Sequence, residues 1–454
     1  MLATPALAPA VRSLPRRRAL ASPPPAPAPR PARSPARLRA VPADDERAPA
    51  AAAPDDAPSA VASAMASPLP PSSSSSPPGT PRATWRVTTS GALSGLERHE
   101  DVLPPPGPGE IRVDVRAIGL NFADVFSVLG LYQAAPPCPF VPGLELSGVV
   151  AEIGPPARDL PPGAVVPEYA VGDDVMCVTR FGAYATRVNA PAHQTRPLPP
   201  GWSHAEGAGF LVQGLTAFYA LSALGGVRRG HKVVVHSAAG GCGSFGLGIC
   251  AALGADAIAT LGNAGKAAVV RERHPELDPE QIIVRDRRRF QAQVEAAAVH
   301  IAKRRGEVDA PGAEPDRVDV VMDAVMGDFF KGGWNALARG GRYVVFGAAD
   351  LTPAGDLRWY NVWGWIKLGW KYARRDFVDP TSLPGENKSV MGFNLIWMFD
   401  KVAELGELLG DLGGLGLPAP AVGARFTFDE LPDALRKFQT GQTTGKVVVV
   451  VEEE

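Results

Sequence analysis

The sequence is poor in the residues from which covalent or metal-built scaffolds are made. Its 454 residues include only four cysteines, and no two of them form a CxxC pair. This spacing argues against a disulfide framework and against a structural zinc site built from cysteines. The seven histidines show no clustered ligand spacing either. We therefore expect no bound metal.

The chain also lacks a strong charge of either sign. Lys and Arg total 46 and Asp and Glu total 47, so the net charge is −1. This balance gives no reason to expect nucleic acid as a partner. No run of 18 apolar residues occurs, so the sequence predicts no transmembrane helix. A length of 454 residues suggests two to three domains.

Acidic residues are missing from the first 43 positions, which carry eight arginines. Residues 1–83 are mostly Ala, Pro, Ser and Arg, and they cannot bury enough apolar surface to offset the entropy of ordering. An Arg-rich, acid-poor leader is typical of an organelle transit peptide. Its proline content and poor amphipathicity favour a chloroplast over a mitochondrion. We expect residues 1–83 to be a disordered transit peptide and linker, and a disordered tail without an address is the alternative.

From Trp85 onward the composition is that of a folded protein. Short β-branched runs separated by Gly and Pro predict a small, mostly antiparallel β domain. These runs lie at 111–115, 148–153 and 174–179. Further along, short buried-strand runs alternate with helical stretches such as 245–253, which is typical of a parallel, doubly wound sheet. Those runs lie at 232–236, 256–260, 318–322 and 342–346.

The C-terminal segments at 425–428, 431–438 and 446–451 resemble the first block again. We therefore expect an α/β protein with a disordered N-terminal leader and two folded domains. The β-rich catalytic domain would span 84–213 and be completed by 416–454. The doubly wound domain would span 214–415, and the active cleft would lie between the two.

The strongest local signal is the glycine-rich turn Val233-Val-Val-His-Ser-Ala-Ala-Gly-Gly-Cys-Gly243. A strand runs into this turn and a helix follows. Glycines let the backbone turn sharply and approach a pyrophosphate, whose charge a helix N-terminus favours. The first glycine of GxGxxG is absent, so the strand–turn–helix setting carries the prediction; a turn without a ligand is the alternative. The expected cofactor-binding residues here are Ser237, Gly240, Gly241, Cys242 and Gly243.

The segment after the next strand favours NADPH over NADH. An NAD site usually places an acidic residue about 20 residues past the glycines. Here the sequence reads Thr260-Leu-Gly-Asn-Ala-Gly-Lys266 and offers no carboxylate. We expect Lys266 to bind a 2′-phosphate, with Thr260 and Asn263 behind it and Arg285 as a second cation. The alternative for Lys266 is a solvated surface lysine.

Taken together, these motifs resemble the medium-chain dehydrogenase/reductase superfamily, and within it the zinc-free quinone oxidoreductase branch. The resemblance runs from about Trp85 to Val451 and is nearest to homologues of the vesicle amine transport protein. Its carriers are Asn121-Phe-Ala-Asp124, Gly130-Leu-Tyr132, the segment 141–149, the turn at 237–243, Met391-Gly-Phe393 and Gly445-Lys-Val-Val. The resemblance implies a GroES-like β-rich catalytic domain, a Rossmann domain that binds NADPH, and a homodimer.

The positions that hold zinc in alcohol dehydrogenases carry other residues here. Those enzymes bind the catalytic ion through two cysteines and one histidine. Motif matching places these slots at Asn121, Leu144 and Val212, which cannot assemble such a site. The resemblance therefore implies direct hydride transfer from NADPH to a small quinone or α,β-unsaturated carbonyl, whose conjugation spreads the incoming charge.

The resemblance also suggests site residues. Asn121 matches an asparagine near the nicotinamide and is expected to position the acceptor, and Tyr132 is expected to donate its hydroxyl. Lys446 is placed with the cofactor-binding residues. A second tyrosine of bacterial quinone reductases is Phe126 here, which is a departure from the pocket of those enzymes. A turn-forming role for Asn121 and a packing role for Tyr132 are the alternatives.

One aromatic and cationic segment, 358–375, holds four of the eight tryptophans. It could cover the substrate cleft or a dimer contact, or make a weak contact with a membrane surface. The resemblance also leaves two other functions open for the whole chain. It could be a lipid- or protein-binding module that keeps NADPH for structure, or an enoyl-thioester reductase.

Overall fold

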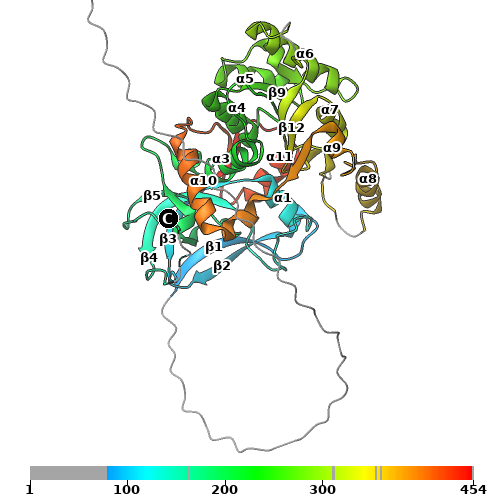
Figure 1. Ribbon diagram of the computed structural model, residues 1–454. Coiled ribbons are helices and arrows are strands. Elements are labelled where there is room, and N and C mark those ends of the chain that lie inside the picture. The colour runs from blue at the N-terminus through cyan, green and yellow to red at the C-terminus, as the bar shows by residue number, and fades with distance from the viewer. Residues whose placement is uncertain are drawn as a thin grey trace, which may run out of the picture. The chain divides into compact units, whose positions relative to one another are not determined.

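The computed structural model describes residues 79–451, except 159, 161–162, 309–311, 353–354 and 358–359. Of the expected transit peptide and linker at 1–83, residues 1–78 lie outside the described residues. So do Arg358 and Trp359 of the aromatic segment. Residues 80–83 are a correction, because they form the start of a β-strand and belong to the folded part. The part from residue 79 onward holds two large β-sheets with helices around them (Figure 1).

The first large sheet is mostly antiparallel and combines strands from both ends of the described chain. Its order is β14-β15-β3-β4-β5-β7, with β6 paired to β3, and only β14 and β15 run parallel. A separate antiparallel hairpin precedes it, formed by β1 (Thr80–Val87) and β2 (Leu96–Leu103). The sheet strands are β3 (Glu110–Gly119), β4 (Glu145–Ile153), β5 (Asp174–Val178), β6 (Arg187–Pro191), β7 (Thr195–Pro197), β14 (Val422–Thr427) and β15 (Lys446–Val450).

The second large sheet is fully parallel, with the order β10-β9-β8-β11-β12-β13. From β8 the chain adds strands on one side of the sheet, through β9 to β10, and from β11 it adds them on the other side, through β12 to β13. The order in which strands are added therefore reverses between β8 and β11. In such sheets a ligand binds outside the carboxyl ends of the strands at this reversal. The strands are β8 (Lys232–Val235), β9 (Asp256–Leu261), β10 (Ile282–Val284), β11 (Val318–Asp323), β12 (Leu337–Val345) and β13 (Ser389–Gly392).

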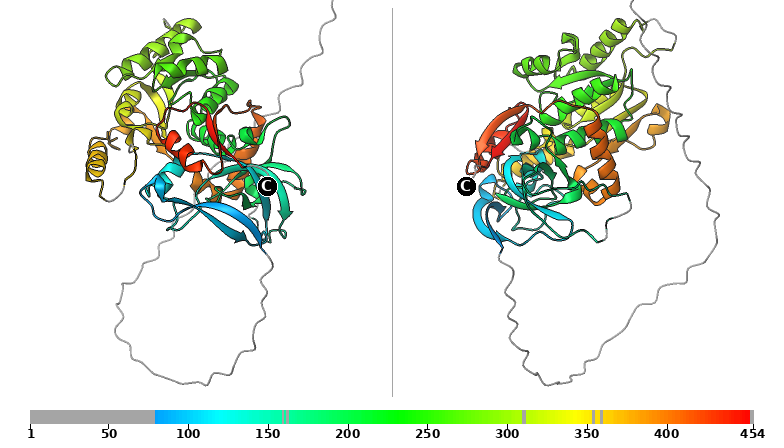
Figure 2. Two further views of the ribbon diagram at one scale, coloured as in Figure 1. Left: turned by 180° about the vertical axis from the view of Figure 1, so that it is seen from behind. Right: turned by 90° about the vertical axis from the view of Figure 1, so that its left-hand side faces the viewer.

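Helices cover both faces of the parallel sheet, so its central strands are buried. All four residues of β8 are buried, which explains why this strand reads as an uninterrupted apolar run. The two further views show the helical layers around this sheet and the β-rich part beside it (Figure 2). The covering helices include α4 (Gly241–Leu253), α5 (Ala267–Arg273), α6 (Phe290–Arg305) and α7 (Phe330–Asn335).

One apolar helical stretch links the two sheets. It comprises α2 (His204–Gly207), α3 (Leu211–Phe218) and a π-helical turn at Tyr219–Leu224. Among the described residues, His204–Leu224 is the stretch with the length and composition to cross a membrane. Because 78% of its most apolar window is buried inside the protein, it serves as a core helix. It packs against α4 and α10 (Val402–Gly414).

The expected architecture is confirmed, and the differences lie at element ends. Helix α4 begins at Gly241, four residues before the expected start, because the glycine turn itself leads into its first turn. Strand β12 begins at Leu337, five residues early. The C-terminal elements β14, α11 (Leu431–Gln439) and β15 return to the first sheet, as the sequence indicated.

Candidate active site

A cavity of about 1180 Å³ lies at the carboxyl ends of the parallel strands. Its wall includes the loops after β8, β9, β11 and β12, which come from the parallel sheet. The opposite wall comes from the β-rich part, through α1 (Phe122–Val128) and the loop that follows it. The cavity thus stands at the topological reversal, where a dinucleotide and a second ligand can meet.

The glycine-rich turn forms one end of this cavity. Ser237, Gly240, Gly241, Cys242 and Gly243 all line it, as expected from the sequence. Ser237 has a positive φ of 53°, which turns the chain out of β8. A Cβ on Gly243 would overlap the carbonyl oxygen of Ser237 and lie 2.6 Å from Ala238 Cα, so only glycine fits there. The turn presents the N-terminus of the 13-residue helix α4 to the cavity.

Gln213 is a cavity residue that the sequence reasoning missed. It lies on α3 with 6% of its surface exposed, and its Oε1 has no hydrogen-bond partner among the described residues. A Cβ on Gly241 would come within 2.6 Å of Gln213 Nε2, so the carboxamide lies directly against the turn. A buried, unpaired acceptor beside a cavity is costly unless a ligand or water donates to it. No motif marks Gln213, because a single carboxamide has no spacing pattern.

Two cations line the end of the cavity beyond β9. Lys266 Nζ donates to the carbonyls of Gly441 (2.7 Å) and Thr443 (2.9 Å), which leaves one of its protons for a ligand. Burial, and then the nearby charge of Arg285, lower the pKa of Lys266. Arg285 lies over the ring of Phe329 at 5.1 Å, and its Nε is buried without a partner. Two like charges in one wall favour an anionic ligand between them.

Asn263 and Thr260 were both expected behind Lys266, and the structure places only Asn263 in the cavity wall. Asn263 lines the cavity and its Nδ2 donates to Gln442 Oε1 at 3.3 Å. Thr260 was expected to bind the cofactor, but its side chain is fully buried and does not line the cavity. Its Oγ1 accepts from Arg285 at 3.1 Å and lies 3.2 Å from His236 Nδ1. Thr260 therefore acts on the cavity through Arg285, whose guanidinium it accepts from at a buried position.

Asn121 lies at the opposite end of the cavity and has only 5% of its surface exposed. Its Oδ1 accepts from Lys446 Nζ at 2.9 Å. Its Nδ2 donates to Gly119 O at 3.2 Å and to Glu145 Oε2 at 3.3 Å. Both ends of this carboxamide are therefore held by the protein, so Asn121 contributes a fixed wall to the site.

Lys446 was grouped with the cofactor-binding residues, and its side chain is found elsewhere. The ammonium is fully buried, lies 2.7 Å from Glu145 Oε2, and does not line the cavity. Glu145 Oε1 in turn accepts from the backbone N–H of Val212 at 2.9 Å. Lys446 thus ties β15 to β4 and to Asn121, and acts on the site through that asparagine.

Tyr132 lines the cavity from the loop after α1, and its hydroxyl is already engaged. It donates to Asn394 Oδ1 at 2.8 Å. Burial raises the pKa of Tyr132 to about 12, so the phenol keeps its proton at neutral pH. Its proton is engaged with Asn394, which also lines the cavity, and the expected donation from Tyr132 to a substrate stays a prediction.

The three positions that match zinc-ligand slots all face this cavity. Asn121, Leu144 and Val212 line it together, beside the aromatic residues Phe126, Phe393 and Phe399. In the part of the chain that the structure describes, no three His, Cys, Asp or Glu side chains gather where they could hold a metal ion.

Burial raises the pKa of Cys242 to about 12, so this thiol stays protonated at the turn.

A buried carboxylate shapes the wall between β11 and β12. Asp323 Oδ1 accepts from the backbone N–H groups of Val325 (2.6 Å) and Met326 (2.9 Å), and Oδ2 accepts from Tyr343 at 2.7 Å. Met326 has a φ of 54°, which is strained for a residue with a side chain. Val325 and Met326 both line the cavity. Asp323 therefore fixes a strained loop in the cavity wall.

Comparison with known families matches the two parts of the chain separately. Residues 107–200 match the profile of the family described as alcohol dehydrogenase GroES-like domain. Residues 296–449 match that of the family described as zinc-binding dehydrogenase.

Individual relatives cover most of the chain. The synaptic vesicle membrane protein VAT-1 homolog of Rattus norvegicus is 30% identical over 361 residues, which are 78% of this chain and 80% of that protein. A mycobacterial protein solved in complex with NADPH is 27% identical and has a TM-score of 0.63, over 81% of this chain and 99% of that one. The quinone oxidoreductase from Thermus thermophilus, also solved with NADPH, is 27% identical with a TM-score of 0.56, over 81% of this chain and 99% of that one.

Proposed function

Because this chain belongs to the VAT-1 homolog family within the medium-chain dehydrogenase/reductase superfamily, we propose that it is an NADPH-dependent reductase of quinones or α,β-unsaturated carbonyls that works without zinc. The observation that carries the proposal is one cavity with three parts. A glycine turn lies at one end, a pair of cations lies beyond it, and an aromatic-lined region free of metal ligands among the described residues lies at the other end.

The residues present fit NADPH. The N-terminus of α4 and the bare backbone at Gly240 suit the pyrophosphate. Lys266 and Arg285 suit a 2′-phosphate, since an anion would relieve their mutual repulsion. The unpaired Oε1 of Gln213 suits a ribose hydroxyl or an amide donor. No acidic side chain takes the place after β9 where an NAD site holds the ribose.

When bound, NADPH supplies a hydride, which adds to a carbon of the acceptor. The electron pair of the acceptor's C=C bond then moves to its conjugated oxygen, and solvent supplies the proton that completes the ketone or hydroquinone. The protein's part is to hold the acceptor flat, exclude water and stabilise the developing oxyanion. Phe393 and Phe346, whose ring centroids are 5.8 Å apart with planes 30° from parallel, offer a flat wall of this kind.

The test is oxidation of NADPH, followed by its absorbance, with a panel of quinones, enones and crotonyl-type thioesters. Turnover of quinones or enones, with little of the thioester, is the expected result. Preferential turnover of the thioester would instead assign an enoyl-thioester reductase. NADPH binding without turnover of any acceptor would contradict the proposed activity.

Zinc independence is tested on the same protein. Turnover should be unchanged after exhaustive dialysis against a chelator, with the residual zinc measured by mass spectrometry. Loss of turnover together with loss of stoichiometric zinc, and its recovery on adding zinc, would contradict the proposed mechanism.

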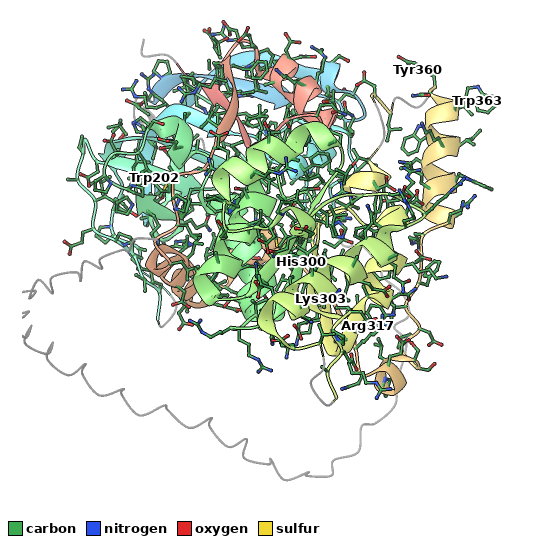
Figure 3. All side chains as sticks on the ribbon, turned by 90° about the horizontal axis from the view of Figure 1, so that it is seen from above. Trp202, His300, Lys303, Arg317, Tyr360 and Trp363 are labelled. Carbon is green, nitrogen blue, oxygen red and sulfur yellow. The ribbon has the colours of Figure 1, made fainter. Side chains whose placement is uncertain are left out.

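A second candidate function, binding to an anionic lipid surface, is favoured by helix α8 (Val362–Ala373). Its side chains at four-residue spacing, Val362, Ile366 and Trp370, are 59%, 54% and 64% exposed, and Trp363 is 81% exposed. Leu368 alone on this helix is buried. Figure 3 shows Trp363 and Tyr360 at the outer edge of the molecule, with Trp363 turned away from the body. The apolar face of this helix thus faces outward, opposite to the usual arrangement on a protein surface.

The charges around α8 suit anionic lipid headgroups. Residues 357–375 contain no Asp or Glu. Arg374 lies over the ring of Trp370 at 5.4 Å, and Arg375 lies over Phe377 at 4.8 Å. Exposed tryptophans beside cations are typical of helices that lie in a membrane interface. The alternatives, a cleft cover and a dimer contact, become outcomes of the test.

Flotation with vesicles of phosphatidylglycerol and phosphatidylcholine tests this surface, with phosphatidylcholine alone as the comparison. The wild type should float with the anionic vesicles, and the double variant Trp363→Glu, Trp370→Glu should not. Trp397→Glu is the matched control, because Trp397 is 51% exposed on another segment. Equal flotation of all three proteins would contradict the assignment. A change in the variant's mass in solution would indicate a dimer contact, and a change in KM a cleft cover.

We also propose a homodimer and a plastid location. Strand β13 stands at the edge of the parallel sheet, with Ser389, Val390 and Gly392 exposed, so it can pair with the same strand of a second copy. Mass measurement by light scattering tests the dimer.

Fusion of residues 1–83 to a fluorescent protein tests the proposed plastid location, with mitochondrial targeting as the alternative outcome.

A further inference from the structure

The carboxamide of Asn394 lies between the two walls of the cavity. It follows β13 and caps the 3₁₀ helix Leu395–Asp400, where its Oδ1 accepts from Ile396 N at 3.5 Å. The same Oδ1 accepts from Tyr132, which is 262 positions away in the sequence and belongs to the opposite wall. Two donors therefore fix the oxygen of this carboxamide toward the protein.

The nitrogen of Asn394 is left as the available group. Among the described residues no acceptor for Nδ2 is found, although Asn394 lines the cavity and is half-buried. Its neighbours Phe393, Ile396 and Phe399 offer no side-chain acceptor. An amide with two unused N–H groups in an apolar wall is satisfied by a ligand or by water.

Three other polar side chains at this end of the cavity are already committed. The carboxamide of Asn121 is held at both ends by Lys446, Gly119 and Glu145. The hydroxyl of Thr216 donates to the carbonyl of Val212 at 2.6 Å. The one proton of Tyr132 goes to Asn394. Asn394 Nδ2 is thus a donor whose carboxamide is held in place by the protein and whose N–H groups are left for a ligand's oxygen.

We propose that Asn394 is the catalytic hydrogen-bond donor to the carbonyl oxygen of the acceptor, and that Tyr132 is the positioning residue that aims it. This inference rests on the proposed reductase function and names the group that selects its substrate. A donor held in place before the reaction stabilises negative charge on the oxygen as the hydride arrives. The site therefore selects conjugated carbonyl acceptors over planar hydrocarbons of the same shape.

Steady-state kinetics with 1,4-naphthoquinone tests the catalytic part. Asn394→Ala should lower kcat/KM by about 100-fold, the loss typical of one oxyanion donor. Tyr132→Phe leaves Nδ2 in place and should lower it by less than about 10-fold. Both variants should keep the wild-type Kd for NADPH, measured by fluorescence, which also shows that they fold. A larger loss in Tyr132→Phe than in Asn394→Ala would overturn the assignment.

A binding measurement without turnover tests the selectivity. In the presence of NADP⁺, which cannot reduce the ligand, Asn394→Ala should bind 1,4-naphthoquinone at least 10-fold more weakly than the wild type does. Its affinity for naphthalene, which has no oxygen, should be unchanged. Equal effects on both ligands, or none on either, would overturn the inference while wild-type turnover leaves the proposed function standing. If the wild type neither reduces nor binds the quinone, the proposed function fails and this inference with it.

Discussion

The ammonium of Lys446 and a carboxylate oxygen of Glu145 lie 2.7 Å apart, and both side chains are completely buried. Lys446 is the first residue of β15, and Glu145 is the first residue of β4. The pair also holds Asn121 and the backbone of Val212, two positions in the cavity wall. One charged pair therefore connects the C-terminal strand to the shape of the active site.

Removing one partner of this pair should be strongly destabilising. Lys446→Met leaves the Glu145 carboxylate buried without a counter-charge, which costs about 3–5 kcal/mol. Denaturant unfolding followed by tryptophan fluorescence measures the loss. The double variant Lys446→Met, Glu145→Gln should regain much of it. Lys401→Met, which breaks the exposed pair with Glu404, is the control and should cost less than about 1 kcal/mol. Equal losses for the buried and the exposed pair would contradict this account.

Reversing the charge of Lys266 should separate the two nicotinamide cofactors. Lys266→Glu should weaken NADPH binding by about 100-fold, as expected for the loss of a charge-assisted bond and the gain of a repulsion. NADH lacks the 2′-phosphate, so its affinity should change by less than about 3-fold. Calorimetric titration gives both values. Arg271→Glu, an equal charge change at an exposed position on α5, is the control. Equal losses for both cofactors would contradict a phosphate contact.

Two glycines of the same helix should respond in opposite ways to alanine. Gly243→Ala places a methyl group against backbone atoms of residues 237 and 238, so it should destabilise the protein and abolish NADPH binding. Gly248→Ala places its methyl group 3.5 Å from a Leu417 side chain, an ordinary contact. Because alanine favours a helix interior, it should stabilise by about 0.5–1 kcal/mol. Thermal unfolding and NADPH titration of both variants check this, and a tolerated Gly243→Ala would rule out the tight turn.

The pH dependence of stability should reflect Asp124. Burial raises the pKa of Asp124 from 3.8 to about 7, so folding favours its protonated form. The stability it contributes is complete below pH 3.8 and is lost as the pH rises through 7. Asp124→Asn should flatten this dependence, gaining roughly 2–4 kcal/mol relative to wild type at pH 8 compared with pH 4. Denaturant unfolding across this range measures it. Asp433→Asn at an exposed position is the control, and a matching response from that variant would contradict the assignment to Asp124.

The fold could be predicted from the sequence because its central strands are buried on both faces. Such strands read as short apolar runs, and β8 and β11 stand within one residue of the expected bounds. The start of α4 could not be predicted in the same way. Gly241 and Gly243 are poor helix formers, and it is the packing of the turn, not helix propensity, that begins the helix there.

Those parts of the candidate site in which a sequence motif fixes the backbone could be predicted. Those parts in which the role depends on the position of a single side chain could not. Gly445 does lie against the turn, since its N–H donates to Ala239 O at 2.9 Å. The next side chain, that of Lys446, points to the other face because strand residues alternate, and so it enters the core. Gln213 and Asn394 escaped notice because an isolated carboxamide gains its role only from neighbours brought together by folding.

The position of β15 bears on how the molecule is made. This strand is inserted between β14 and β3, so the β-rich sheet cannot close until residues 446–450 have been synthesised. Until then the carboxylate of Glu145 has no counter-charge from Lys446, which lies 301 positions later in the sequence. A nascent polypeptide truncated before residue 446 therefore cannot hold Asn121 through Lys446, and it should remain dependent on chaperones.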